Sequence, residues 1–319
     1  MSDTFQNLTP PDDQLFFRKN DRHDPRLGEI VPHTKYEESH LVILGCPQDE
    51  GVRRNGGREG AALAPDAIRE QFYRLTPFGI HHKICDLGNL GLLGSLEETH
   101  DELTKIAKKV LQDGKKLIVL GGGNDISYAD GRAMSEVFGS RNWLGVNVDA
   151  HLDVRIDTQI TSGTPYRRLL DEKLIRSDYL YEIGYQPQVV SHVYYRYLQN
   201  LGVNMVSVDQ LRSRETADLE LRELMRQRFV HHSQSLTAFF AFDLHAVRAS
   251  DAPGTSVPSP VGLRSGEFLN LVQFAAKLVN TKMIEFTEVN PKYDVDGRTS
   301  KLVAVALHRF CSSQPKLGG

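Results

Sequence analysis

Short runs of hydrophobic residues alternate along the chain with longer segments that carry an amphipathic pattern. The short runs are mostly bounded by Gly or Asp, which is typical of buried parallel strands. They predict strands at residues 41–44, 117–120, 144–148, 179–181, 203–206, 236–242 and 283–286. The longer segments repeat hydrophobic residues at i, i+3 and i+4 and predict helices at residues 61–75, 103–111, 190–201, 218–229 and 267–279.

This alternation predicts an α/β fold in which helices cover both faces of a central parallel sheet. In such folds, function gathers at the carboxyl ends of the strands. Residues 1–40 contain Pro10-Pro11 and no sustained periodicity, so we expect an N-terminal arm there. Residues 41–319 contain no repeat or long linker, and we expect them to form a single domain.

Composition and charge narrow the class of protein. The chain has 319 residues, of which 40% are hydrophobic, and this content excludes a disordered chain. Its 38 Lys and Arg residues nearly balance 41 Asp and Glu, and the net charge of -3 predicts binding to neither nucleic acid nor a membrane. Neither a membrane-spanning run nor a signal peptide is present, and the three cysteines are widely separated, so we expect a cytoplasmic protein.

The segment Asp149-Ala150-His151-Leu152-Asp153 places three candidate metal ligands at the end of a predicted strand. Because alternate side chains of an extended segment point to the same side, two carboxylates and an imidazole can converge on one point. This mixture of oxygen and nitrogen donors suits Mn, Fe, Co, Ni or Zn and is poor for Ca. The alternative is a pair of helix-capping aspartates with an incidental histidine.

Two other predicted strands are followed by polar residues. Asp243 and His245 follow one hydrophobic run, and Asn124 and Asp125 follow three glycines after another. Since parallel strands end at the same edge of a sheet, we expect these side chains to lie near the first cluster. The glycine turn lacks the further residues of a nucleotide-binding motif, so we do not expect a nucleotide there.

Several motifs together resemble the arginase/agmatinase/formimidoylglutamase family of ureohydrolases. They are N-G-G-R-E-G-A at 55–61, G-G-G-N-D at 121–125, D-A-H-L-D at 149–153, F-D-L-H at 242–245 and E-V-N-P at 288–291. The resemblance extends from about residue 41 to residue 310. It implies a three-layer α/β/α fold with a roughly eight-stranded parallel sheet. It also implies a homo-oligomer, either a trimer or a hexamer.

The resemblance further implies a binuclear metal centre. The implied ligands are Asp149 and Asp243 for both ions, Asn124 and Asp153 for one ion, and His151 and His245 for the other. The family usually has His at position 124 and Asp at position 245, so this chain departs from the pattern at both. Mn²⁺ is the ion that the resemblance favours, and the two departures make Ni, Co or Zn alternatives.

Such a centre suits the hydrolysis of an amidine or guanidine C–N bond. Two ions that share a water lower its pKa, and the hydroxide that bridges them is a nucleophile. The resemblance assigns proton transfer to Asp153 and binding of the cationic amidinium to Glu288. Without the resemblance, Glu288 is more typical of a helix-capping carboxylate. The alternative to an active enzyme is a catalytically impaired relative with a weakened metal site.

The residues that follow the ligands indicate which amidine is bound. Arg155 stands in a D-x-R pattern after Asp153, and Ser162 and Tyr166 belong to an S-G-T-P-Y segment, a combination that resembles the formimidoylglutamases. An arginine suits their substrate, which carries two carboxylates. The implied reaction converts N-formimidoyl-L-glutamate to L-glutamate and formamide, a step of histidine degradation. A guanidino acid, agmatine or arginine is the alternative small-molecule substrate.

A glycine-rich loop after the first predicted strand can also approach a ligand. It contains Asn55 and Arg58, and we expect Arg58 either to bind the second carboxylate or to brace the loop. A surface ion pair is the alternative role for Arg155. Cys46 precedes the loop, and we expect it to be an inert core residue.

Overall fold

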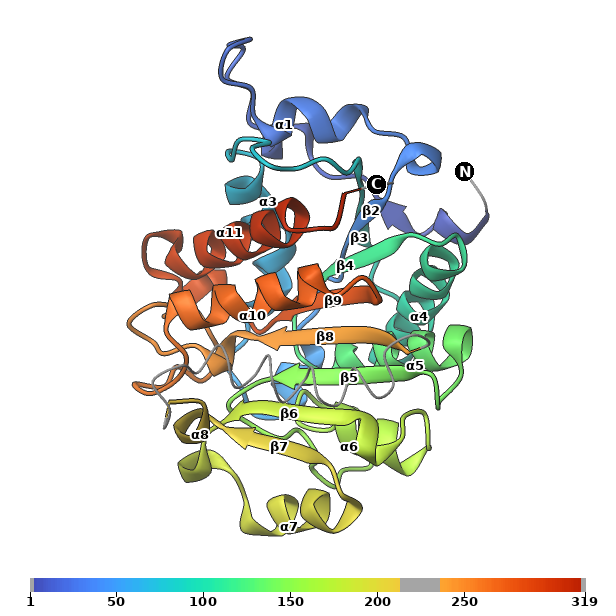
Figure 1. Cartoon of the computed structure of the whole chain (residues 1–319), viewed down its shortest axis with the longest axis vertical. Coiled ribbons are helices and arrows are strands. Elements are labelled where there is room, and N and C mark those ends of the chain that lie inside the picture. Colours follow the sequence, from blue (N-terminus) through green and yellow to red (C-terminus); the bar gives the residue numbers. More distant parts are fainter. Residues whose placement is uncertain (1–2, 213–235, 317–319) are drawn as a thin grey trace.

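A nine-stranded sheet runs through the computed structural model, which describes residues 3–212 and 236–316 (Figure 1). The strand order is β1-β3-β2-β4-β9-β8-β5-β6-β7. The strands are β1 Leu8–Thr9, β2 Leu41–Gly45, β3 Ile84–Leu90, β4 Lys116–Leu120, β5 Trp143–Val148, β6 Leu180–Tyr185, β7 Asn204–Ser207, β8 Thr237–Asp243 and β9 Thr281–Thr287. All pairs are parallel except β1 with β3.

The hydrophobic runs correctly predict β2 and the six strands from β4 to β9, and the α/β class is confirmed. They miss β3, because Asp86, Gly88 and Asn89 interrupt its hydrophobic residues. They also miss β1, which is two residues long and pairs antiparallel with β3. The sheet therefore has one more strand than the roughly eight expected, and one antiparallel edge.

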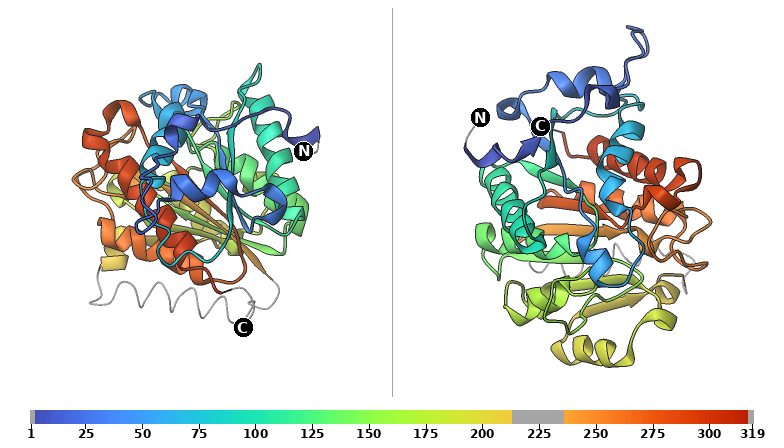
Figure 2. Two further views of the ribbon diagram at one scale, coloured as in Figure 1. Left: turned by 90° about the horizontal axis from the view of Figure 1, so that it is seen from above. Right: turned by 180° about the vertical axis from the view of Figure 1, so that it is seen from behind.

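Helices cover both faces of this sheet. The longer α-helices are α3 Ala64–Phe72, α4 Leu96–Gln112, α5 Ile126–Phe138, α6 Pro165–Asp171, α7 His192–Leu201, α10 Ser265–Lys277 and α11 Arg298–Ser312. The shorter ones are α1 Leu27–Ile30, α2 Glu50–Arg54 and α8 Val208–Arg212. Helices α3, α10 and α11 pack together on one face, and α4, α5 and α6 on the other (Figure 2). Within the described residues, none of the helices is both long and apolar enough to cross a membrane.

Four of the predicted helices are present with shifted ends, as α3, α4, α7 and α10. The helix predicted at residues 218–229 lies outside the described residues. The amphipathic pattern misses α5, because this helix buries the polar residues Ser127 and Asp130 and also Gly131. A helix that buries polar residues hides the hydrophobic period that would reveal it.

The four central strands end level with one another. Leu120 of β4 pairs with Phe286 of β9, which also pairs with Phe242 of β8. Phe242 in turn pairs with Val148 of β5. The polar residues that follow these strands therefore leave the sheet along one edge, as the strand pattern predicts.

A buried arginine joins helix α3 to strand β3. The Arg69 side chain is fully buried and donates hydrogen bonds to the two Asp86 carboxylate oxygens at 2.8 and 3.0 Å. It also donates to the carbonyl of Gly88 at 2.8 Å. Asp86 is itself enclosed, so its charge depends on Arg69 for compensation.

Replacing Arg69 should therefore destabilise the fold. We expect Arg69→Met to lower the free energy of unfolding by about 3–5 kcal/mol, because it leaves the buried Asp86 carboxylate without its partner. Urea unfolding followed by circular dichroism measures this change. Arg74→Met is the control, because the Arg74–Glu70 pair is about half exposed and should contribute less than about 1 kcal/mol. Equal losses in the two variants would contradict this assignment.

Candidate metal centre and substrate pocket

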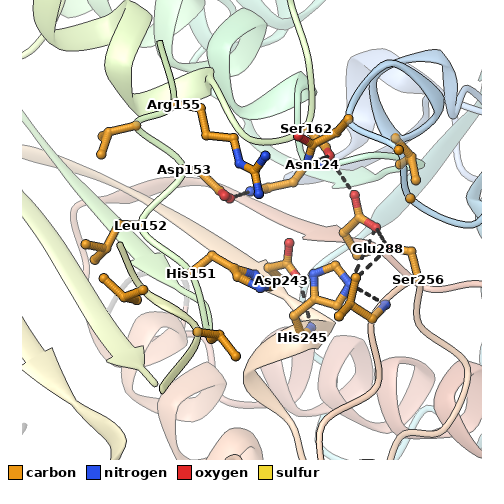
Figure 3. Close-up of a pocket in the computed structure, with 18 of the residues that line it drawn as sticks. Asn124, His151, Leu152, Asp153, Arg155, Ser162, Asp243, His245, Ser256 and Glu288 are labelled. Atoms are coloured by element: carbon orange, nitrogen blue, oxygen red, sulfur yellow. Dashed lines mark hydrogen bonds and ion pairs between the residues drawn. The ribbon is translucent and has the colours of Figure 1, made fainter. Parts of the chain in front are cut away.

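The six predicted metal ligands lie at the ends of β4, β5 and β8 or shortly after them, and Figure 3 shows all of them except Asp149. Five of them line one cavity of about 310 Å³, namely Asn124, His151, Asp153, Asp243 and His245. The sixth, Asp149, is buried. The structure therefore brings together the residues that the sequence pattern selects.

Asp149 belongs to two groups of candidate ligands. One group contains Asp149, His151 and His245, and the other contains Asp149, Asp153 and Asp243. Within each group, one ligand atom of each residue lies within 4.8 Å of the others. The Oδ2 atom of Asp149 is buried and has no hydrogen-bond partner among the described residues. A buried carboxylate that belongs to both donor groups and has one unpartnered oxygen fits a pair of divalent cations.

The three carboxylates of this site resist simultaneous ionisation. Burial, and then the charge of Asp149, raises the pKa of Asp153 well above its usual range, and the same causes raise the pKa of Asp243. Burial acts on Asp149 as well, but the hydrogen bond and charge of His151 outweigh it and lower the pKa of Asp149. Bound cations would remove this conflict by compensating the charges.

Two residues of the pocket have unusual backbone conformations. Asp153 has a φ of 43° and Glu288 has a φ of 63°, in the left-handed region that side chains with a Cβ rarely adopt. Such positions persist only where the surrounding structure holds them, and they concentrate at functional sites. Here the backbone N–H of Glu288 donates to the carbonyl of Gly122 at 2.8 Å, which holds that turn in place.

The side-chain amide of Asn124 directs its nitrogen toward the other candidate ligands. Its Nδ2 donates to Asp153, while its Oδ1 accepts from Ser127 Oγ at 2.9 Å and from Thr287 Oγ1 at 3.1 Å. An amide nitrogen is a donor only and does not bind a metal. Asn124 would have to rotate its amide to become a ligand, and an ion bound here would have a weaker set of donors than a histidine would provide.

His245 belongs to the first donor group and contacts Asp243 of the second. Its Nδ1 is 3.0 Å from Asp243 Oδ1, and its ring centroid is 5.2 Å from that of His151. Burial would lower the pKa of His245, but the charge and hydrogen bond of Asp243, together with the charges of Glu288 and Asp149, outweigh burial and raise this pKa to about 10. Because a metal binds the deprotonated nitrogen, cation binding here would release a proton.

Glu288 follows β9 and lines the same cavity. Its Oε1 accepts from the backbone N–H of Asn124 at 3.0 Å, and its Oε2 accepts from the Ser256 hydroxyl. Burial raises the pKa of Glu288 to about 7, with the charge of His245 acting in the opposite direction. Figure 3 shows its carboxylate between Asn124 and Ser256, where it can face a cationic group in the pocket.

Three of the predicted substrate-binding residues line the cavity, namely Asn55, Arg155 and Ser162. Asn55 Nδ2 donates to Ser162 Oγ at 3.0 Å. A Cβ at Gly163 would lie 2.7 Å from Arg155 Cδ, so glycine makes room for the arginine. Among the described residues the Arg155 guanidinium forms no ion pair, and Figure 3 shows it pointing toward Asp153 and Asn124.

The other two predicted substrate-binding residues do not line the cavity. Arg58 donates to the carbonyls of Ser256 at 3.1 Å and Thr255 at 2.7 Å, and its guanidinium lies 3.9 Å from the Tyr293 ring. Tyr166 is 1% exposed, and its hydroxyl has no partner among the described residues. The contacts of Arg58 support its loop-bracing interpretation, and burial keeps Tyr166 from direct contact with a ligand in the cavity.

Sequence patterns do not reveal every residue of the pocket. They miss Ser256, whose only signal is its place shortly after the F-D-L-H motif. They also miss Val257 and the start of α7, where Tyr194 lines the cavity. Tyr194 belongs to a Y-Y-R-Y run that indicates a helix packed on the sheet. The run alone does not show that Tyr194 lines a pocket.

Known proteins resemble this chain along most of its length. The family model for the arginase family matches residues 39–312. Formimidoylglutamase from Staphylococcus haemolyticus is 32% identical over 275 residues, which cover 86% of this chain and 86% of the relative. Trypanosoma cruzi formiminoglutamase with Mn²⁺ has a TM-score of 0.83 and 30% identity, covering 92% of this chain and 100% of that chain. Formimidoylglutamase from Bacillus subtilis has a TM-score of 0.84 and 25% identity, covering 92% of each chain.

The orientation of Asn124 leads to a prediction about metal content. We expect Asn124→His to raise the occupancy of the ion that Asp153 would bind, because imidazole is a stronger donor than an amide. Metal analysis after dialysis against limiting Mn²⁺ measures this occupancy. Asn55→His is the control, because Asn55 lines the cavity outside both donor groups. Unchanged metal content in Asn124→His would remove position 124 from the ligand set.

Proposed function

Because the chain belongs to the arginase family, we propose that it hydrolyses N-formimidoyl-L-glutamate to L-glutamate and formamide. The observation that carries this proposal is one cavity lined by members of both groups of metal donors and by Arg155, whose guanidinium forms no ion pair with a described residue. The formimidoylglutamases among the similar proteins support the same substrate.

The donor set suits two divalent cations, and Mn²⁺ is our first choice because a similar formiminoglutamase structure contains it. The ligands that we propose are Asp149 and Asp243 for both cations, His151 and His245 for one, and Asp153 and Asn124 for the other. When bound, such cations lower the pKa of water and polarise the carbon that it attacks.

The protein residues then orient the substrate and move protons. Glu288 pairs with the amidinium and places its carbon at the donor groups. Arg155 binds a carboxylate at the other end of the substrate, which fixes its direction in the cavity. Asp153, at the donor groups, accepts a proton from the attacking water. It delivers that proton to the amino nitrogen of glutamate as the C–N bond breaks.

We also infer from the resemblance that the protein is a cytoplasmic homo-oligomer, either a trimer or a hexamer. Light scattering on the purified chain tests the number of subunits. These two statements are independent of the chemistry proposed for the pocket.

The reaction can be tested with a small panel of substrates. We expect formamide from N-formimidoyl-L-glutamate, and little urea from arginine, agmatine or a guanidino acid. Removal of metal with EDTA should abolish the activity, and added Mn²⁺ should restore it. Urea release without formamide would replace this proposal with another ureohydrolase activity. No product from a protein that holds both ions would identify a catalytically impaired relative.

The role of Arg155 can be tested separately. We expect Arg155→Met to raise the KM for N-formimidoyl-L-glutamate roughly 10- to 100-fold, because a charged hydrogen bond to a carboxylate contributes about 1.5–3 kcal/mol. Steady-state kinetics of formamide release measures the change. Arg167→Met is the matched control, because Arg167 pairs with Asp171 on α6 and does not line the cavity. A KM that is unchanged in Arg155→Met would assign the carboxylate to other residues.

A further inference from the structure

The Ser256 hydroxyl connects a candidate metal ligand to the carboxylate that faces the substrate. Its Oγ lies 2.9 Å from Nε2 of His245 and donates to Oε2 of Glu288. Ser256 is 5% exposed and lines the cavity. It is therefore placed to influence both the cation site at His245 and the orientation of Glu288.

Nε2 of His245 has a second neighbour, the backbone N–H of Val257, which favours the opposite position of the ring hydrogen. The backbone N–H of Val257 points at Nε2 from 3.1 Å. This contact requires a lone pair on Nε2, so a neutral ring then carries its hydrogen on Nδ1. Nδ1 is the nitrogen that lies 3.0 Å from Asp243. With a hydrogen on Nδ1, the imidazole has no lone pair to offer a cation beside Asp243.

Ser256 favours the arrangement that can bind a metal. Because its hydroxyl hydrogen is directed to Glu288, its oxygen lone pairs are available to accept a hydrogen from Nε2. With the hydrogen on Nε2, the lone pair of Nδ1 faces Asp243 and the other donors. Histidines that bind metals usually donate their second ring N–H to an oxygen in this way. The Oε2 of Glu288 is farther from Nε2, at 3.7 Å.

The loop that carries Ser256 is held in place from both sides. Arg58 donates to the carbonyls of Ser256 and Thr255, and its guanidinium lies over the Tyr293 ring. Thr255 also forms a backbone bridge with Val289, the residue after Glu288. These contacts fix the Ser256 backbone relative to Glu288, so the hydroxyl does not depend on a mobile loop for its position.

We propose that Ser256 is a positioning residue that keeps Nδ1 of His245 available for a cation and at the same time orients Glu288. The inference rests on the proposed function, because it takes His245 as a ligand of one cation. Without the hydroxyl, Nε2 keeps two polar neighbours, the Val257 N–H at 3.1 Å and Glu288 Oε2 at 3.7 Å. The nearer one, the Val257 N–H, favours a ring with its hydrogen on Nδ1, which leaves no lone pair there for a metal.

Removing the hydroxyl should weaken one of the two cation sites. We expect Ser256→Ala to bind Mn²⁺ at one site about 10- to 100-fold more weakly, the range typical of lost partners of metal-binding histidines. Isothermal titration calorimetry with Mn²⁺ measures this without any substrate. Ser256→Thr keeps a hydroxyl and should retain both sites. Thr255→Val is the control, because it removes a hydroxyl with no described partner from the same loop.

A variant at position 245 distinguishes this role of Ser256 from general damage to the site. A carboxylate at position 245 has no ring hydrogen to place, so in a His245→Asp background Ser256→Ala should not lower Mn²⁺ affinity further. The KM for N-formimidoyl-L-glutamate should still rise in that background, because Glu288 loses the Ser256 hydrogen bond. The two effects of Ser256 are therefore measured by two independent quantities.

Each outcome bears on a different claim. Wild-type Mn²⁺ affinity at both sites in Ser256→Ala would overturn the inference, and so would an equal loss in the His245→Asp background. A wild-type chain that binds Mn²⁺ at both sites but releases no formamide would contradict only the proposed function, because the binding measurement uses no substrate. A wild-type chain with no second Mn²⁺ site would overturn both.

Discussion

Three carboxylates packed against one another at the edge of the sheet are the constraint on which the site depends. Burial and mutual repulsion raise the pKa values of Asp153 and Asp243, while His151 stabilises the charge of Asp149. A protein can hold such a group only if protons or cations compensate the charges. Divalent cations do so without removing the negative charge from the ligands. Relief of this repulsion therefore contributes to metal affinity, and bound metal in turn stabilises the folded chain.

The sheet supplies the rigidity that this arrangement requires. Strands β4, β9, β8 and β5 are adjacent and end in one row, so residues far apart in the chain meet without long loops. Because β9 lies between β4 and β8, Glu288 stands between Asn124 and the residues that follow β8. The left-handed backbone at Glu288 is held by the hydrogen bond from its N–H to the Gly122 carbonyl, and that at Asp153 by backbone N–H groups of α6 that donate to its carbonyl.

The clustering of the candidate ligands could be predicted from the sequence because it depends on local regularities. Side chains two residues apart on an extended segment share a side, and this rule selects Asp149 and Asp153 from the sequence. In the structure the chain bends after β5 and Asp153 is left-handed, yet the two carboxylates still meet. The role of Arg58 depends instead on a loop nearly 200 positions away, and no local pattern encodes such a contact. The role of Ser256 depends on side-chain contacts with His245 and Glu288, 11 and 32 positions away. The rotation of the Asn124 amide is set by hydroxyls on α5 and β9, so residue type alone does not reveal it.

Of the two departures from the family pattern, only the imidazole at position 245 changes the charge of the ligand set, because the amide at position 124 replaces a neutral imidazole. An imidazole at position 245 and an amide at position 124 leave Asp149, Asp153 and Asp243 as the only anionic groups among the six proposed ligands. Two divalent cations would exceed the charge of these three carboxylates by one unit, and a cationic amidinium would then meet a positive centre. Glu288 supplies the missing negative charge beside His245, at 3.7 Å from its ring nitrogen. The contacts of Ser256 with His245 and Glu288 hold that carboxylate beside the imidazole, where it can supply the negative charge that the imidazole lacks. In this chain the ligand and the substrate-facing carboxylate therefore have to be understood as one unit.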